Sequence, residues 1–331
     1  MNLENKKVLI TGADGFIGSH LTERVLSRCS SVRALCQYNS FQSLGWLDHS
    51  PIRDEVEILS GDIRDPSQCR EMVEGIDVVF HLAALIGIPY SYQAPHSYVD
   101  TNIKGTLNLL EASRKIGIER FLQTSTSEVY GTAQTIPMTE HHPLYPQSPY
   151  AATKVGSDAL AMSYYLSYSM PVLIARPFNT YGPRQSIRAV LPTIIVQALE
   201  GQKEIRLGKC SPTRDFTFVQ DTCEGMIELV SCDEGIGEVV QIGTGEEISI
   251  GNAAKYILEI MGKENIKIVT DEKRLRPEAS EVERLVCDPS KLEKLTGFRP
   301  IIFFGNGIEK MVEWFSNPKN LALYDAGRYG V

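Results

Sequence analysis

Two side chains suited to proton transfer lie four residues apart in the segment YAATK, which runs from Tyr150 to Lys154. Residues at this spacing share one face of a helix, so the phenol and the ammonium group are expected to be neighbours. The ammonium group lowers the pKa of the phenol, and the phenolate can take a proton from a substrate alcohol as hydride leaves. The same spacing is common on solvated helix faces, so the pair alone only suggests an oxidoreductase-type site.

A second polar cluster lies in the segment STSEVYG, where Thr126, Ser127 and Glu128 directly follow a predicted strand at 119–125. Hydroxyl groups can hydrogen-bond a substrate oxygen, and a carboxylate can remove or deliver a proton. The alternative is that Thr126 and Ser127 only terminate the strand. A glutamate directly beside them favours a role in handling substrate.

A glycine-rich loop, TGADGFIGSH, lies between the first predicted strand and the first predicted helix. Glycine tolerates the turn, and the missing Cβ lets a pyrophosphate approach the N–H groups at a helix N-terminus. Because the triplet has the strand–loop–helix context, it predicts dinucleotide binding. The loop residues expected to contact the cofactor are Gly12, Gly15, Phe16, Ile17 and Gly18.

The identity of the dinucleotide stays open between NAD and NADP. NAD sites of this class usually carry an acid at the end of the second strand to hold the ribose hydroxyls. Here that strand ends in VRALCQYNS, with no acid between Glu23 and Asp48 and no arginine just beyond it. Further cofactor contacts are expected from Asp62 and Ile63 near the adenine, and from the small residues Ala83 and Ala84 at the end of the fourth strand.

The first half of the chain alternates short apolar runs with longer amphipathic segments, which predicts a doubly wound parallel sheet with helices on both faces. In the segment 97–116, Val99, Ile103, Leu107 and Leu110 recur at helical spacing and are expected to form one buried face. Strands are expected at 6–11, 31–36, 56–60, 77–83, 119–125 and 171–176, and helices at 16–28, 66–74, 97–116 and 148–168.

The pattern loosens after residue 180, and no linker or internal repeat separates the two parts. We expect a dinucleotide-binding domain over 1–180, with contributions from later segments, and a nucleotide-sugar-binding lobe of mixed α/β structure over 181–331. In this lobe, helices are expected at 188–200, 249–261, 289–296 and 305–316, and short strands at 204–207, 216–219 and 238–242.

Composition limits the function further. The chain has 331 residues, 43% of them hydrophobic, and a net charge of −8, which disfavours nucleic-acid and membrane-surface partners. No apolar run has the length of a membrane span and the N-terminus lacks a signal peptide's profile. Seven scattered cysteines without a C-x-x-C pair indicate reduced thiols and a cytoplasmic location, and the histidines show no metal-ligand spacing.

Taken together, these motifs resemble the extended short-chain dehydrogenase/reductase superfamily, in its nucleotide-sugar branch. The likeness covers nearly the whole chain, through TGADGFIG, HLAA, TNIKGTLNLLEA, STSEVYG, YAATK, RPFNTYGPR, TRDFTFVQD and RPEASEVERL. Within the branch, the chain is similar to the NDP-sugar 4,6-dehydratases, above all those acting on N-acetylglucosamine nucleotides in legionaminic-acid biosynthesis. The segments IPYSYQAP and NLALYDAGRYGV add to that likeness.

The resemblance implies a reaction that begins and ends with the same form of a tightly held, recycled NAD or NADP. Tyr150 would take the 4-hydroxyl proton, with Lys154 beside it, and Thr126 would hydrogen-bond the C4 oxygen. Glu128 would remove the C5 proton before water leaves from C6. Many relatives have aspartate where this chain has Ser127, which leaves open the group that protonates the leaving hydroxyl.

The resemblance also implies substrate contacts and a homodimer built from the helices at 97–116 and 148–168, whose second faces carry Leu109, Leu160 and Tyr164. The nucleotide base is not revealed. Residues expected to contact the substrate are Asn179, Arg184, Leu191, Arg214 and Arg276.

Three other functions compete with dehydration. UDP-glucuronate oxidative decarboxylases can share STSEVYG, although RPEASEV is more similar to the dehydratases. A 4-epimerase has no need of Glu128 beside Thr126. A dinucleotide-binding redox sensor without turnover often lacks the tyrosine or the lysine, and both are present here.

Overall fold

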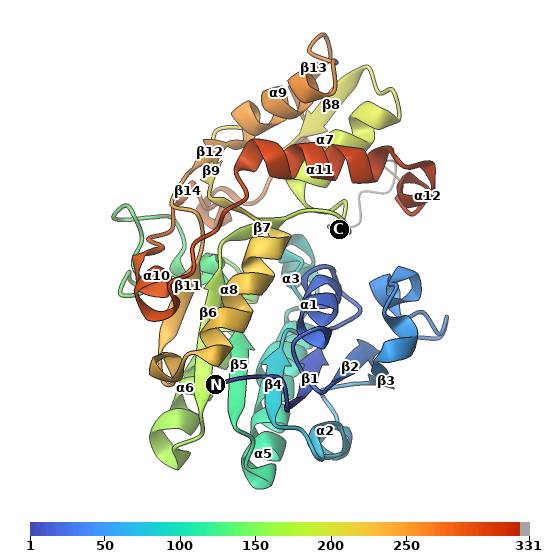
Figure 1. Cartoon of the computed structure of the whole chain (residues 1–331). Coiled ribbons are helices and arrows are strands. Elements are labelled where there is room, and N and C mark those ends of the chain that lie inside the picture. Colours follow the sequence, from blue (N-terminus) through green and yellow to red (C-terminus); the bar gives the residue numbers. More distant parts are fainter. Residues whose placement is uncertain (325–331) are drawn as a thin grey trace.

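The computed structural model describes residues 1–324 and is built around one seven-stranded parallel sheet (Figure 1). The strand order is β11-β6-β5-β4-β1-β2-β3, so the chain runs outward from β1 to one edge and then crosses back to the other. Such a reversal places a crevice at the carboxyl ends of the central strands. The strands are β1 (Lys7–Thr11), β2 (Ser31–Gln37), β3 (Glu57–Gly61), β4 (Val78–His81), β5 (Arg120–Thr124), β6 (Val172–Pro177) and β11 (Val239–Ile242).

Helices cover both faces of the sheet, which confirms the doubly wound fold expected from the sequence. On one face, α1 (Phe16–Leu26) and α8 (Val219–Ser231) share a core with Val8 and Ile10 of β1. On the other face, α2 (Pro66–Val73), α5 (Thr106–Ile116) and α6 (Pro149–Tyr168) pack around Leu9. Alternate residues of β1 therefore point into two separate cores, as the pleat of a strand requires.

The segment expected as one helix over 97–116 differs from a regular α-helix. It comprises α4 (Pro95–Tyr98), a π-helical segment Val99–Gly105, and α5. Hydrogen bonds from i to i+5 add a residue to each turn and rotate the following side chains around the axis. The expected buried face is consequently wrong in part, because Val99 and Leu107 are 39% and 36% exposed, whereas Asn102 is buried.

The argument for an apolar second face on these helices also needs correction. Leu109 and Tyr164 are buried inside the subunit, and Leu160 packs partly against the same core. The exposed apolar side chains of this region are instead Val99, Leu107, Ile116, Leu166 and Tyr168.

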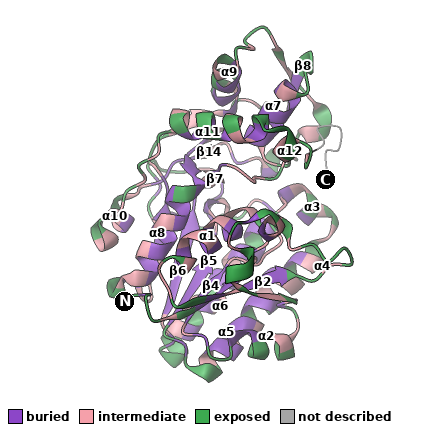
Figure 2. Cartoon of the chain, turned by 45° about the vertical axis from the view of Figure 1, so that its right-hand side comes forward, coloured by how far each residue is buried: buried purple, intermediate pink, exposed green. Residues whose placement is uncertain are grey.

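The second part of the chain forms a smaller mixed lobe above the carboxyl ends of the sheet (Figure 1), consistent with expectation. The central strands of the main sheet, among them β4, β5 and β6, are almost entirely buried (Figure 2). The lobe returns β11 to the edge of the main sheet, where it pairs with β6. Its helices are α7 (Val190–Leu199), α9 (Ile250–Ile260), α11 (Phe304–Ser316) and α12 (Pro318–Leu321), whereas α10 (Ser290–Thr296) packs against α8 and β11 at the edge of the main sheet.

Three small sheets organise this lobe and the junction between the two parts. They pair β7 (Asn179–Tyr181) with β10 (Phe216–Phe218), and β8 (Glu204–Leu207) with β13 (Lys267–Thr270). The third comprises β12 (Ile248–Ser249), β9 (Thr213–Arg214) and β14 (Arg284–Leu285). A further short helix, α3 (Ile88–Gln93), follows β4.

Within residues 1–324, no helix is long and apolar enough to cross a membrane. The same residues contain no group of three or more His, Cys, Asp or Glu side chains arranged to hold a metal ion. All seven cysteines are free thiols. Most of the tail NLALYDAGRYGV, from residue 325 onward, lies outside the described residues.

Candidate active site

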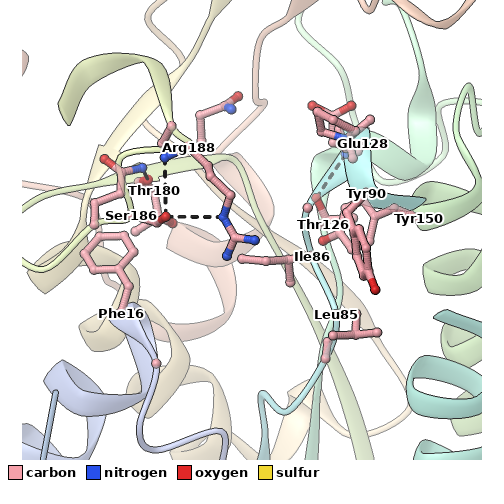
Figure 3. A pocket seen from close by; sticks show the side chains of 18 of the residues that line it. Phe16, Leu85, Ile86, Tyr90, Thr126, Glu128, Tyr150, Thr180, Ser186 and Arg188 are labelled. Carbon is pink, nitrogen blue, oxygen red and sulfur yellow. Dashed lines mark hydrogen bonds between the residues drawn. The ribbon is translucent and has the colours of Figure 1, made fainter. Parts of the chain in front are cut away.

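A cavity of about 1410 Å³ lies between the carboxyl ends of the sheet and the smaller lobe. Figure 3 shows Thr126, Glu128 and Tyr150 on one side of it, with Phe16 and Arg188 on the other. Every residue that the sequence analysis assigned to catalysis, cofactor or substrate lines this cavity. Residues from 12 to 276 are thus brought to one place.

The glycine loop packs closely against the segment that follows β4 and leaves the start of α1 open to the cavity. Gly12 has a φ of +70°, and a Cβ there would lie 2.9 Å from the backbone nitrogen of Ala83. Gly15 precedes the first turn of α1 and supplies no side-chain cap, so the N–H groups of that turn face the cavity unprotected. Such a helix N-terminus attracts anions. The loop therefore fits a dinucleotide.

Beneath this loop, His81 joins two strands and a helix through a chain of hydrogen bonds. Thr106 donates to the Asn102 carbonyl at 2.7 Å, so it must accept from Nε2 of His81 at 3.0 Å. His81 Nδ1 then accepts from Thr11 at 2.8 Å, and Thr11 Oγ1 accepts the Ala83 N–H at 3.0 Å. Burial, and less strongly Lys154, lower the pKa of His81 to about 3, so it stays neutral and fixes Ala83 in the cavity wall.

Tyr150 and Lys154 lie in the first turns of α6, and local sequence explains why the helix begins there. The Ser148 side chain accepts the Ala151 N–H, and Pro149 occupies the first helical position. Both side chains are buried, and Lys154 Nζ donates to the Thr124 carbonyl at 2.5 Å. Helix α6 thus aims the pair at the carboxyl end of β5.

Burial sets the proton affinities of this pair in the absence of ligand. It lowers the pKa of Lys154 to about 8, and the charge of Asp158 opposes that effect. It raises the pKa of Tyr150 well above its usual value; the Thr126 hydroxyl opposes this, whereas Glu128 adds to it. The tyrosine therefore needs further positive charge nearby before it can act as a base at neutral pH.

Behind Lys154 lies a buried ion pair that the sequence analysis did not identify. Asp158 Oδ2 accepts from Arg176 at 3.0 Å and from Ser125 at 2.5 Å. Arg176 also donates to the Tyr130 hydroxyl at 3.0 Å, and Gln241 of β11 donates to the same oxygen at 2.8 Å. The network ties β5, β6, α6 and β11 together next to the residues predicted to be catalytic.

Thr126, Ser127 and Glu128 form the turn that leaves β5. Thr126 Oγ1 accepts the Glu128 N–H at 3.2 Å, which starts a short 3₁₀ turn over Ser127–Tyr130. Ser127 is 2% exposed, and Glu128 is half-buried. Glu128 lies within electrostatic reach of Tyr150 on one side and of Arg214 on the other.

Two arginines from the smaller lobe share one carboxylate at the far end of the cavity. Glu281 Oε1 lies 3.6 Å from Arg214 and 3.9 Å from Arg276. Burial lowers the pKa of Arg214, and Glu128 opposes this effect. One guanidinium nitrogen of Arg276 and Oδ1 of Asn179 are buried without a hydrogen-bond partner. Because such groups are costly to leave unpaired, both are suited to a polar ligand.

The remaining predicted substrate residues are placed differently. Arg184 donates to Glu23 of α1 at 2.8 Å and to Ser19 at 3.2 Å, so its guanidinium is engaged on the cofactor side of the cavity. Leu191 is 1% exposed in the first turn of α7 and contributes to the core as well as to the cavity wall.

The sequence analysis missed Arg188 and Glu281 as cavity residues. Arg188 donates to Ser186 at 3.3 Å and points across the cavity towards Ile86 (Figure 3). Arg188 lies in the segment QSIRAV and Glu281 in the segment RPEASEV. Neither segment has a regular apolar spacing, so the sequence carries no signal that these side chains reach the cavity.

Comparisons with known proteins agree with this geometry. The family described as GDP-mannose 4,6 dehydratase matches residues 9–311. The low-salt glycan biosynthesis protein Agl12 of Haloferax volcanii is 36% identical, over 93% of this chain and 98% of its own. A dTDP-glucose 4,6-dehydratase of an Actinoplanes species is 34% identical, over 93% and 97%. Relatives at 32% and 31% identity are named as a UDP-N-acetyl-alpha-D-glucosaminuronate decarboxylase and a putative UDP-glucose 4-epimerase.

Among solved structures, DesIV of Streptomyces venezuelae, a dTDP-glucose 4,6-dehydratase with NAD and TYD bound, superimposes with a TM-score of 0.85. It is 29% identical, and the match covers 95% of this chain and 98% of DesIV. The chain belongs to the NDP-sugar 4,6-dehydratase family of extended short-chain dehydrogenases/reductases, whose members depend on a nicotinamide dinucleotide.

Proposed function

We propose that this protein is a 4,6-dehydratase that converts an N-acetylglucosamine nucleotide, linked to UDP or GDP, into its 4-keto-6-deoxy derivative. The observation that carries this proposal is the shared wall of Thr126, Glu128 and Tyr150 in the cavity that also holds the glycine loop. The resemblance of IPYSYQAP and NLALYDAGRYGV to the enzymes of legionaminic-acid biosynthesis supports the acetamido sugar.

The first step is oxidation at C4 of the hexose. Bound NAD or NADP supplies the acceptor for the C4 hydride and the donor that returns it to C6. Tyr150 takes the 4-hydroxyl proton, and the positive charge of Lys154 lowers the pKa of its phenol. The Thr126 hydroxyl, which already interacts with Tyr150, donates to the C4 oxygen as it becomes a ketone.

The second step removes water across C5 and C6. A ketone at C4 acidifies the C5 proton, because the resulting carbanion is delocalised as an enolate. Glu128 takes that proton, and its place on the short turn after β5 supports this role. Glu128 also returns a proton to the departing C6 hydroxyl, since the serine at 127 is a poor acid. The enone would then accept hydride at C6, and Glu128, reprotonated from solvent, would return a proton to C5 while Tyr150 releases the proton it took from the 4-hydroxyl.

The diphosphate lies between the two arginines of the smaller lobe in this proposal. Arg214 and Arg276 offer guanidinium groups that match phosphate oxygens, and the unpaired Oδ1 of Asn179 can accept from a substrate hydroxyl. Glu281 would exchange its contacts with both arginines for the incoming anion.

Mass spectrometry of the products tests the function. The purified protein is incubated separately with UDP- and GDP-N-acetylglucosamine, dTDP-glucose and UDP-glucuronate. Loss of one water with formation of a 4-keto-6-deoxy sugar from an N-acetylglucosamine nucleotide supports the proposal. Loss of carbon dioxide from UDP-glucuronate would identify a decarboxylase, and an isomer of unchanged mass would identify a 4-epimerase. Dinucleotide binding without turnover of any sugar would favour a redox sensor.

We also propose a cytoplasmic homodimer. The exposed apolar side chains of Val99, Leu107 and Leu166 on the helices at 95–116 and 149–168 support an interface there. Light scattering after size-exclusion chromatography would give the mass in solution, and charged substitutions at Leu107 and Leu166 should yield monomers.

A further inference from the structure

The carboxyl end of β2 carries a negative charge that the sequence of the strand itself lacks. Asp14 lies in the glycine loop, yet its Oδ2 accepts the backbone N–H of Gln37, the last residue of β2, at 3.2 Å. The loop is held to the strand by a second bond, from Ala13 N to the Leu35 carbonyl at 3.0 Å. Asp14 therefore stands where an acid at the end of β2 would otherwise project.

The segment after β2 fixes the position of Asp14 from the outside. Trp46 N donates to the Asp14 carbonyl at 3.0 Å. Gly45 has a φ of +58°, and a Cβ there would lie 2.9 Å from Cβ of Asp14. Asp14, Gln37 and Trp46 all line the cavity. The carboxylate is therefore a rigid part of the cavity wall.

Among residues 1–324, no cation pairs with Asp14: burial raises the pKa of its carboxyl, and the backbone N–H of Gln37 opposes this effect. Burial, followed by the charges of Asp14 and Asp48, raises the pKa of the Cys36 thiol to about 12. Asp48 is engaged within its own loop, where it accepts from Leu44 N at 2.8 Å. On the next strand end, Arg64 donates to both carboxylate oxygens of Asp62, at 3.0 and 2.9 Å, and is therefore neutralised.

We propose that Asp14 selects NAD over NADP, by accepting hydrogen bonds from the adenosine ribose hydroxyls and repelling a 2′-phosphate. The inference rests on the dinucleotide site of the proposed function and adds its specificity. A carboxylate can accept hydrogen bonds from two ribose hydroxyls. The 2′-phosphate of NADP would instead place a second negative charge beside the carboxylate, which is unfavourable in the wall of a cavity. The discriminating acid thus comes from the glycine loop and replaces the one missing from β2.

Intrinsic fluorescence gives a direct readout of binding. The chain has only two tryptophans, Trp46 and Trp314, and their rings lie 5.7 Å apart beside the adenosine end of the cavity. Titration with NAD and with NADP, without sugar nucleotide, should perturb this emission. Calorimetry gives the two dissociation constants independently, and mass spectrometry identifies any dinucleotide that copurifies.

We expect wild-type protein to bind NAD roughly 100-fold more tightly than NADP, as a like-charge contact costing several kcal/mol implies. Asp14→Asn keeps the shape of the side chain and an oxygen that accepts the Gln37 N–H, but it removes the charge. The preference in affinity for NAD over NADP should therefore fall to about 10-fold or less. Asp48→Asn removes a nearby charge outside the cavity wall and should leave the ratio almost unchanged. Added salt should weaken the wild-type discrimination.

Equal affinity of the wild-type protein for the two dinucleotides, or copurified NADP, would overturn the inference. An unchanged ratio in a folded Asp14→Asn protein would do the same; if that variant does not fold, the wild-type ratio and the copurified dinucleotide decide. Failure of both dinucleotides to bind would instead contradict the proposed function.

Discussion

Lys154 and Asp158 occupy successive turns on the buried face of α6, and their charges support each other. Asp158 is held by Arg176 and Ser125, and Lys154 is held by the Thr124 carbonyl. The carboxylate raises the pKa of a lysine that burial lowers to about 8. Lys154 also lies within electrostatic reach of the neutral His81. The proton on Lys154 therefore depends on a residue that does not line the cavity.

Asp158→Asn should move the alkaline limb of kcat/KM to lower pH. Without the carboxylate, the pKa of Lys154 falls, so the lysine loses its proton earlier as pH rises and no longer stabilises the Tyr150 phenolate. Ser125→Ala, which leaves the charge of Asp158 in place, is the matched control. Because Arg176 loses its partner, a destabilisation of about 3–5 kcal/mol is also expected, measurable by urea unfolding. An alkaline limb at the wild-type position would contradict the role of Asp158.

Tyr150→Phe should abolish turnover and spare the cofactor. Removing a general base typically lowers the rate by about 10²–10⁴-fold, whereas the phenyl ring preserves the shape of the site. The measurements are kcat with the sugar nucleotide and dinucleotide affinity by fluorescence. The control is Tyr164→Phe on the same helix. The Tyr164 hydroxyl lies outside the cavity and donates to Glu111 at 2.6 Å, so this variant should behave as wild type. Unchanged turnover in Tyr150→Phe would count against the mechanism.

Glu128→Gln should separate oxidation from dehydration. Tyr150, Lys154 and Thr126 remain, so hydride still leaves C4, but no carboxylate removes the C5 proton. In a single turnover with excess enzyme, absorbance of the reduced nicotinamide should rise and persist, and the sugar should keep its water. If the variant still forms the 4-keto-6-deoxy product at the wild-type rate, another residue must be the base.

Arg214→Gln and Arg276→Gln should each raise KM by about 10- to 100-fold with a smaller effect on kcat. A hydrogen bond to a charged group contributes about 1.5–3 kcal/mol, and the diphosphate keeps its charge throughout the reaction. Arg299→Gln provides the control, since Arg299 is a surface residue paired with Glu293 at 2.8 Å. Equal KM values for Arg214→Gln, Arg276→Gln and Arg299→Gln would place the diphosphate elsewhere.

Acid should destabilise the fold through His81. Its pKa is about 3 in the folded protein against 6.5 when unperturbed, so between these values the unfolded chain binds more protons. Stability is therefore retained above pH 6.5 and declines as pH falls towards 3. Each pKa unit corresponds to about 1.4 kcal/mol, which gives about 2 kcal/mol lost on acidification to about pH 5.

Urea unfolding at several pH values measures that decline. His81→Gln should flatten the dependence, and part of it should remain because burial also lowers the pKa of His20 to about 4. An identical slope in wild type and His81→Gln would exclude His81 as the source.

Local patterns were enough to predict the parts of the fold that local interactions build. The glycine loop and the alternation of apolar strands with amphipathic helices are features of a few consecutive residues, and the structure has the sheet they imply. The start of α6 was also predictable, because Ser148 and Pro149 are local signals.

Other elements were missed for physical reasons. Helix α8 begins directly after β10 without a side-chain cap, so the sequence carries no start signal for it, although Val219, Cys223, Met226 and Val230 recur at helical spacing and are buried in the core. The π-helical turn at Val99–Gly105 rotated a face that a constant period of 3.6 residues would have buried.

The sequence by itself determined the class of sheet, the glycine loop and the tyrosine–lysine pair, since each depends on spacing within one element. Only the tertiary structure decided that Asp14 reaches the end of β2, that Glu281 lies between Arg214 and Arg276, and that Asp158 is buried with Arg176. These relationships join side chains from separate elements, and their energies depend on distance and burial, which no pattern along the chain encodes.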